Sequence, residues 1–215
     1  MQSLEHSMND TIPQIYCNMN KHCLRQLCLT QRLTLVPEQL EQVSQAVSNL
    51  FFKQFNISNI NYLHTFLPIL KKHEINTWLI IKHLRENYPH LKIVVPKIHW
   101  STYDMESYLL TPESQVIDNA WGIPEPIDAS PLPHQEQIDM VLLPLLGFDA
   151  QGFRVGYGKG FYDRFLSKCR KDVVKVGLGL DKPIERIEDV HANDIRMDFC
   201  ITDKKVFCFS SSTTS

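Results

Sequence analysis

The hydrophobic positions change their repeat along the chain, and these changes mark out the expected elements. Apolar residues recur every three or four positions over residues 37–55, which predicts a helix that a proline begins. Similar spacing predicts helices over residues 19–33 and 76–88. By contrast, residues 138–146 are almost continuously apolar, which is typical of a strand that is covered on both faces in the middle of a sheet.

Shorter apolar segments predict further strands, and a last helix is expected after the apolar run. The expected strands are 60–67, 92–95, 103–110, 173–180 and 199–202, and the expected helix is 160–169. Pro96 is expected to end its strand, and the proline-rich segment 112–137 is expected to be a long loop. This alternation predicts an α/β fold, a single three-layer α/β/α domain with a mostly parallel central sheet. The domain should span residues 19–209, between a poorly ordered extension (1–18) and a disordered tail (210–215).

Composition narrows the class of protein. The 215 residues carry a net charge of −2, so no basic surface for nucleic acid is indicated. The first thirty residues contain no long apolar run, which predicts a cytoplasmic protein without a signal peptide or membrane span. The six cysteines form no Cys-x-x-Cys pair, which favours reduced thiols and gives no zinc spacing. We expect small-molecule partners and a monomer or weak dimer.

Candidate chemistry is concentrated in residues 147–164, which hold five of the eight glycines. A strand, a glycine-rich turn with Arg154 and Lys159, and a helix N-terminus together predict an anion site, because glycines let backbone N–H groups approach phosphate. Two common templates fail. Gly160 stands where a Walker A loop needs Ser or Thr, and Phe161 stands at the third glycine of a dinucleotide fingerprint.

The ordered residues Gly147-Phe-Asp-Ala-Gln-Gly-Phe-Arg-Val-Gly-Tyr-Gly-Lys-Gly-Phe-Tyr-Asp-Arg164 resemble the signature of the 5-formyltetrahydrofolate cyclo-ligase family. The chain departs from that pattern at Val155, where leucine is usual, and at Phe161, where tyrosine is usual. A turn that needs only glycines is the simpler alternative, but such a turn does not require Arg154, Lys159 and Asp163 at these offsets. The resemblance extends over roughly residues 21–207.

The resemblance implies an ATP site. It gives Arg154 and Lys159 catalytic roles and extends to Lys21-His-Cys-Leu-Arg25, which is similar to the family's Lys-x-x-Leu-Arg. A spacing of four places both cations on one helical face, from which they could reach one phosphate chain. The alternative is that they form only a solvated basic face. The implied ATP-binding residues are Lys21, Arg25, Arg154, Val155, Gly156, Tyr157, Gly158, Lys159, Gly160, Phe161 and Tyr162.

The resemblance also implies a folate site. Glu74-Ile-Asn-Thr77 is similar to the family's Glu-x-x-Thr turn, whose glutamate binds the pterin ring. Trp121 lies in a segment similar to Trp-x-Ile-Pro-x-Pro and can stack on a folate ring, or simply anchor its loop to the core. The implied substrate-binding residues are Leu67, Glu74, Trp121, Tyr157 and Phe161.

Magnesium is the implied metal, held by Asp163 together with Asp194 or Asp198. The implied reaction is the ATP- and Mg²⁺-dependent conversion of 5-formyltetrahydrofolate to 5,10-methenyltetrahydrofolate, through attack of the formyl oxygen on the γ-phosphorus. Two alternatives stay open. One is a sugar-phosphate isomerase or CoA-transferase-like enzyme, which needs no ATP, and the other is a non-catalytic folate- or nucleotide-binding protein.

Overall fold

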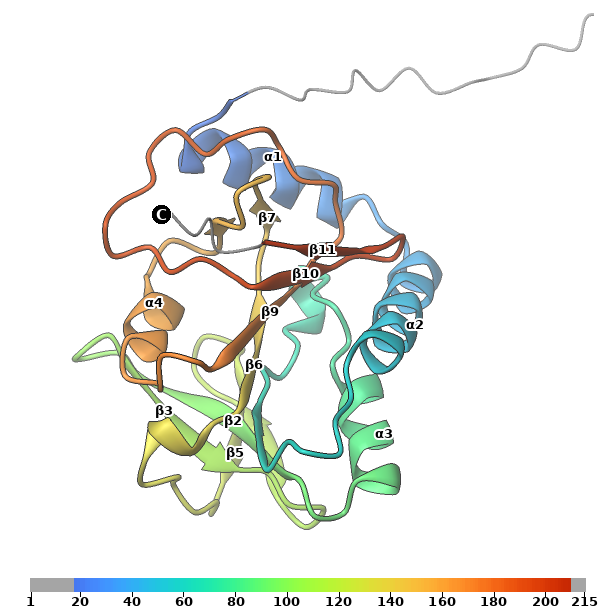
Figure 1. The fold of residues 1–215 in the computed structure, drawn as a ribbon, viewed down its shortest axis with the longest axis vertical. Coiled ribbons are helices and arrows are strands. Elements are labelled where there is room, and N and C mark those ends of the chain that lie inside the picture. The colour runs from blue at the N-terminus through green and yellow to red at the C-terminus, as the bar shows by residue number, and fades with distance from the viewer. Residues whose placement is uncertain (1–17, 210–215) are drawn as a thin grey trace, which may run out of the picture.

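The computed structural model describes residues 18–209. The tail expected at 210–215, and all but the last residue of the extension expected at 1–18, lie outside the described residues. The described part has one seven-stranded sheet with helices around it (Figure 1).

The central sheet is mostly parallel, as the sequence predicted. Its strand order is β11-β10-β9-β6-β1-β2-β3, and only the two edge pairs, β10–β11 and β2–β3, are antiparallel. The strands are β1 Tyr62–His64, β2 Lys92–His99, β3 Asp104–Leu109, β6 Met140–Pro144, β9 Val174–Leu178, β10 Phe199–Ile201 and β11 Val206–Cys208. Strand β6 is the predicted apolar run, and it pairs on both sides.

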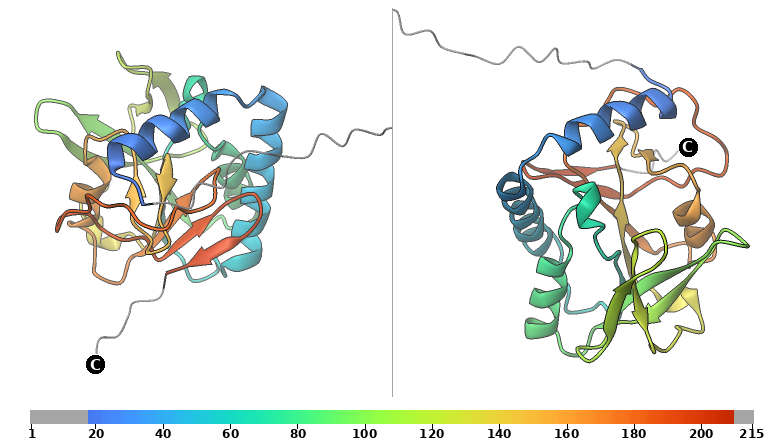
Figure 2. Two further views of the ribbon diagram at one scale, coloured as in Figure 1. Left: turned by 90° about the horizontal axis from the view of Figure 1, so that it is seen from above. Right: turned by 180° about the vertical axis from the view of Figure 1, so that it is seen from behind.

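Helices lie on both faces of the sheet and across one end of it. Helices α2 (Pro37–Gln54) and α3 (Trp78–Asn87) cover one face, and the short α4 (Phe161–Leu166) packs on the other (Figures 1 and 2). Helix α1 (Lys21–Leu33) crosses the end of the sheet where β6 leads into β7. Two short 3₁₀ helices, η1 (Leu70–Lys72) and η2 (Gln135–Gln137), lie in the connections.

Helix α1 begins at a capping residue and buries one face. The Asn20 side chain accepts a hydrogen bond from the Cys23 N–H at 2.8 Å, which caps α1. The buried positions of α1, Leu24 and Cys28, are one turn apart and pack on the end of the sheet with Ile187. The two faces of the sheet form separate cores, one beneath α2 and α3 and one beneath α4.

Three sequence predictions about elements were wrong. Strand β2 continues through Pro96 to His99, because β1 pairs with β2 only as far as Val94 and the proline then has a strand on one side alone. The expected loop 112–137 contains a hairpin, β4 (Gln115–Asp118) with β5 (Pro124–Ile127). The glycine-rich segment forms a small ribbon, β7 (Gly147–Phe148) with β8 (Arg154–Val155), before it reaches α4.

Candidate active site

A cavity of about 530 Å³ opens at the carboxyl ends of the parallel strands, where ligands bind in open α/β sheets. Residues that directly follow β1 and β6, such as Leu67 and Leu145, form its floor. The cavity brings together every predicted site residue except Trp121 and Asp198, the alternative to Asp194. Those that line it are Lys21, Arg25, Leu67, Glu74, Asp163, Asp194 and the whole stretch 154–162.

The glycine-rich loop between β8 and α4 forms one wall of the cavity, and Arg25 holds it in place. Arg25 Nε donates to the Gly156 carbonyl oxygen at 2.9 Å. Gly158 has a φ of +85°, and a Cβ there would lie 3.0 Å from an Arg25 nitrogen, so this close approach requires glycine. Helix α4 has only six residues, so positive charge at this wall comes mainly from side chains and loop N–H groups rather than from a long helix dipole.

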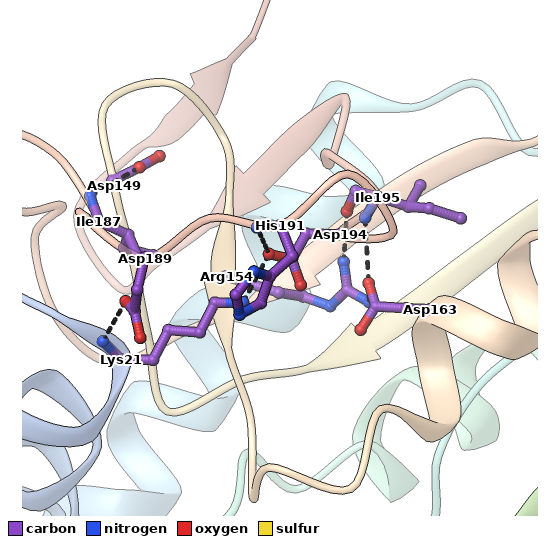
Figure 3. Close-up of polar contacts among 9 residues, drawn as sticks. All are labelled: Lys21, Asp149, Arg154, Asp163, Ile187, Asp189, His191, Asp194 and Ile195. Carbon is purple, nitrogen blue, oxygen red and sulfur yellow. Dashed lines mark hydrogen bonds and ion pairs between the residues drawn. The ribbon is translucent and has the colours of Figure 1, made fainter.

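Arg154 and Asp163 form a closed ring of polar contacts beside the loop. Arg154 Nη2 donates to Asp163 Oδ1 at 2.9 Å, and Nη1 donates to the Ile195 carbonyl oxygen at 2.6 Å. The Ile195 N–H then donates to the same Asp163 oxygen at 3.0 Å, as Figure 3 shows. The Arg154 side chain is only 6% exposed, so this ring fixes the guanidinium at the wall of the cavity.

Another wall is formed by residues 186–195, here called the C-terminal strap, in which sequence analysis singled out only Asp194. The Lys21 N–H donates to Asp189 Oδ1 at 2.6 Å, and Lys21 Nζ pairs with Asp194 Oδ2 at 2.5 Å (Figure 3). The His191 N–H also donates to that Asp194 oxygen. The strap therefore closes the cavity against the first turn of α1.

Asp149 fixes the beginning of the strap, although sequence analysis gave it no role. Its side chain is fully buried. Oδ1 accepts from the Gln151 N–H at 3.0 Å and from the Phe153 N–H at 2.9 Å, while Oδ2 accepts from the Ile187 N–H at 3.0 Å (Figure 3). This one carboxylate thus joins the β7–β8 turn to the strap.

The two alternatives for the second metal residue differ in position. Asp194 lines the cavity with Asp163, whereas Asp198 is not part of the lining and pairs with Lys175 at 2.8 Å. Within residues 18–209 no three His, Cys, Asp or Glu side chains gather into a metal cluster. Asp163 Oδ2 and Asp194 Oδ1 accept no hydrogen bond from the described residues, so each carboxylate keeps an oxygen that fits a hard cation.

Glu74 also lines the cavity and is buried. Its Oε1 accepts from the Tyr157 hydroxyl at 2.9 Å, and its Oε2 accepts from the Ile69 N–H at 2.8 Å. Burial raises the pKa of Glu74, while these two hydrogen bonds and the charges of Arg32 and Lys72 oppose the rise. Each oxygen retains a second lone pair for a ligand donor.

Trp121 is not brought to the cavity. It is 56% exposed and stacks on Trp100, with ring centroids 4.3 Å apart, and Trp100 is the residue that lines the cavity beside Phe161. Direct stacking of Trp121 on a ring in the cavity is therefore not supported by this arrangement. Sequence analysis missed Trp100 because it ended the strand at Pro96, although Ile98 and Trp100 continue the alternation toward the same edge of the sheet.

No helix in the described part of the chain is long and apolar enough to cross a membrane. Among proteins of known sequence, the chain is 30% identical over 128 residues to a probable 5-formyltetrahydrofolate cyclo-ligase of Schizosaccharomyces pombe, a match over 53% of this chain and 62% of the relative. That match spans less than two thirds of the relative. The 5-formyltetrahydrofolate cyclo-ligase of Escherichia coli K12 is 24% identical over 188 residues, which cover 82% of this chain and 97% of that one.

Two solved structures share the fold. The 5,10-methenyltetrahydrofolate synthetase of Aquifex aeolicus superposes with a TM-score of 0.70 at 23% identity, covering 91% of this chain and 95% of that chain. The synthetase of Mycoplasma pneumoniae gives a TM-score of 0.66 at 23% identity, covering 86% and 100%. At this identity they show the fold alone. The sequence description of the 5-formyltetrahydrofolate cyclo-ligase family matches residues 18–203, which is most of the chain, and the chain therefore belongs to that family.

Proposed function

We propose that this chain converts 5-formyltetrahydrofolate to 5,10-methenyltetrahydrofolate. The reaction would use ATP as its Mg²⁺ complex and release ADP and phosphate. One observation carries the proposal: a single cavity is lined both by the buried carboxylate of Glu74 and by a glycine-rich loop with cations. The carboxylate suits the N–H donors of a pterin, and the loop suits a chain of phosphates. The cavity volume of about 530 Å³ is in the range that binds small molecules.

The phosphates would lie along the loop. Arg25 and Lys159 line the cavity and form no ion pair with the described residues, so their charges are available to an anion. Arg154 is pre-positioned by Asp163 and the strap. Phosphoryl transfer needs mainly positioning and charge neutralisation, which these three cations and the loop N–H groups supply.

Magnesium would be held by Asp163 and Asp194 through the oxygens that keep free lone pairs. Mg²⁺ commonly takes one or two carboxylates and completes its shell with water and phosphate oxygens, so two protein ligands suffice. When bound, it supplies charge neutralisation between the phosphates. The pairing with Lys21 holds the Asp194 carboxylate at the wall of the cavity.

The folate would lie between Glu74 and the loop. Leu67, Tyr157 and Phe161 line this end of the cavity and offer apolar and aromatic surface to a flat ring. The formyl oxygen then faces the phosphate end, and its attack on the γ-phosphorus releases ADP. N10 next bonds to the formyl carbon, loses its proton, and the phosphate leaves with the former formyl oxygen. The substrate supplies the nucleophile in both steps, so no nucleophilic serine or cysteine is required.

Two alternatives make different use of the same residues. An isomerase of the sugar-phosphate class would use one carboxylate of the cavity as its base and would need no ATP, so the dependence of turnover on ATP separates it from the proposed reaction. A non-catalytic binding protein would bind folate and nucleotide without turnover. A cytoplasmic location and a monomeric or weakly dimeric state stay predictions from the sequence.

The test is the appearance of methenyltetrahydrofolate absorbance when the chain is mixed with 5-formyltetrahydrofolate, ATP and Mg²⁺. We expect turnover that stops when ATP is omitted or when a chelator removes Mg²⁺, and that produces ADP in equal amount. Product formed without ATP would contradict the proposal in favour of ATP-independent chemistry. Binding of both ligands without any product would leave the non-catalytic reading in its place.

A further inference from the structure

The connection between β1 and α3 places a lysine inside the folate end of the cavity. Lys72 ends the 3₁₀ helix η1 and lines the cavity wall. Its Nζ lies 4.4 Å from the centroid of the Tyr157 ring, and the hydroxyl of that ring donates to Glu74 Oε1 at 2.9 Å. One tyrosine therefore has an ammonium over its ring and a buried carboxylate at its hydroxyl.

Lys72 is not paired with an acidic side chain of the described residues. No carboxylate among residues 18–209 lies within the 4.0 Å of an ion pair from Lys72 Nζ. Glu74 is near enough for the two charges to interact, but its oxygens are bonded to Tyr157 and Ile69 instead. The neighbouring Lys71 is exposed and does not line the cavity, so the position of Lys72 is specific to that residue.

A carboxylate acceptor beside an ammonium donor matches one chemical pattern, a ring edge on which N–H donors adjoin a carbonyl oxygen. The 2-amino-4-oxopyrimidine half of a folate has such an edge, with the 2-amino and N3 hydrogens next to the 4-oxo oxygen. We propose that Lys72 is a specificity-determining residue that donates a hydrogen bond to the 4-oxo oxygen while Glu74 accepts from the adjacent N–H groups. This proposal rests on the folate-dependent function proposed above.

The proposal predicts discrimination at the 4-position of the ligand. A 4-amino-4-deoxy analogue places N–H donors where the 4-oxo oxygen would be, opposite an ammonium that has only donors. The analogue also lacks the N3 hydrogen that faces Glu74, a difference common to all variants of Lys72, so a change in the ratio of affinities between variants reports on Lys72. A site built around such an interaction rejects the analogue because a donor is left without a partner. If Lys72 only shields the Tyr157 ring through a cation–π contact, its loss should weaken both ligands equally.

The experiment compares Lys72→Met with Lys71→Met, which removes the same charge from the same connection. Methionine keeps most of the length of the lysine stem, so the wall of the cavity is retained. Dissociation constants for 5-formyltetrahydrofolate and for its 4-amino-4-deoxy analogue are measured by calorimetry on the full chain without ATP. We expect Lys72→Met to bind the 4-oxo ligand about tenfold more weakly, the loss of one charge-assisted hydrogen bond at a partly exposed site. The ratio of the two dissociation constants should shift toward the analogue by about the same factor.

The controls separate this proposal from the function on which it rests. Lys71→Met should retain the wild-type ratio. An unchanged ratio in Lys72→Met, in a protein whose wild type turns over 5-formyltetrahydrofolate, would overturn the role of Lys72 alone. A wild type that neither binds nor converts 5-formyltetrahydrofolate would overturn the proposed function and this inference together.

Discussion

Replacing Asp149 by asparagine tests whether one buried carboxylate holds the C-terminal strap to the body of the protein. The aspartate accepts three backbone N–H groups, two on Oδ1 and one on Oδ2, and is fully buried. An asparagine in the same rotamer keeps its single carbonyl oxygen toward Gln151 and Phe153. Its amide nitrogen then faces the Ile187 N–H. Two hydrogen-bond donors would thus face each other in a buried position, and the Ile187 N–H would have no acceptor.

The magnitude follows from this count of donors and acceptors. The hydrogen bond from Ile187 to a charged acceptor contributes about 1.5–3 kcal/mol, and a buried donor left without a partner costs about 1–3 kcal/mol. We therefore expect Asp149→Asn to lower the free energy of unfolding by about 3–5 kcal/mol, a large part of the roughly 5–15 kcal/mol of a typical domain. For a domain of this size that corresponds to a fall in Tm of about 6–20 °C.

Urea unfolding followed by tryptophan fluorescence measures the change, with Asp118→Asn as the matched control. Asp118 is exposed in β4 and makes no hydrogen bond or ion pair with the described residues, so the control removes the same charge and no contact. The control should stay within about 0.5 kcal/mol of wild type. If Asp149→Asn were no less stable than Asp118→Asn, the carboxylate would not be what joins the strap to the β7–β8 turn.

The remaining predictions concern three residues of the cavity and the buried His64 of β1. Lys159→Ala should lower turnover by about 10²–10³ with an unchanged Tm, because the side chain serves the phosphate end and not the core; near-normal turnover would refute the phosphate role. Glu74→Gln should weaken 5-formyltetrahydrofolate binding by about 10- to 100-fold and leave the KM for ATP unchanged, since the amide offers a donor to the donors of the pterin; equal effects on both ligands would indicate general damage. Asp163→Asn should raise the Mg²⁺ concentration for half-maximal activity, and an unshifted titration would assign the metal to other groups. Burial lowers the pKa of His64 to about 3, so on acidification below about 6.5 the unfolded state takes up a proton that the folded state excludes. Wild type should accordingly lose about 2 kcal/mol more than His64→Gln between pH 7 and pH 5, and parallel losses in urea titrations would contradict this.

The parts of the fold that depend on local pattern were predictable from the sequence. The periodicity of α2 and the unbroken apolar run of β6 come from residues whose burial repeats along the segment itself. Pro96 misled the prediction because a missing N–H is tolerated wherever the neighbouring strand has ended, and strand ends are tertiary information. The β4–β5 hairpin was missed for a similar reason. The two prolines in β5 are typical of a loop when the segment is considered alone, and its pairing with β4 is tertiary information.

For the site, the ordered signature gave the loop and Asp163, and the resemblance near the C-terminus gave Asp194 or Asp198. The structure brings the loop, Asp163 and Asp194 into one cavity. Trp100, Lys72 and the strap residues other than Asp194 were not predicted. They become part of the site through contacts between segments far apart in sequence, such as Lys21 with Asp189. A single sequence carries no periodic signal for contacts of that kind.

The position of α1 across the end of the sheet has a consequence for the order of events during synthesis. Lys21 and its partner Asp189 are 168 residues apart, so the helix emerges from the ribosome long before the strap that covers it. At about 5–20 residues per second, the interval is about 10–30 s. For most of that time Leu24 and Cys28 have no β7–β8 ribbon to pack against, and Ile187 is made only at its end. The nascent chain therefore carries an uncovered amphipathic helix at its leading end, and the cavity cannot close until nearly the whole protein has been made.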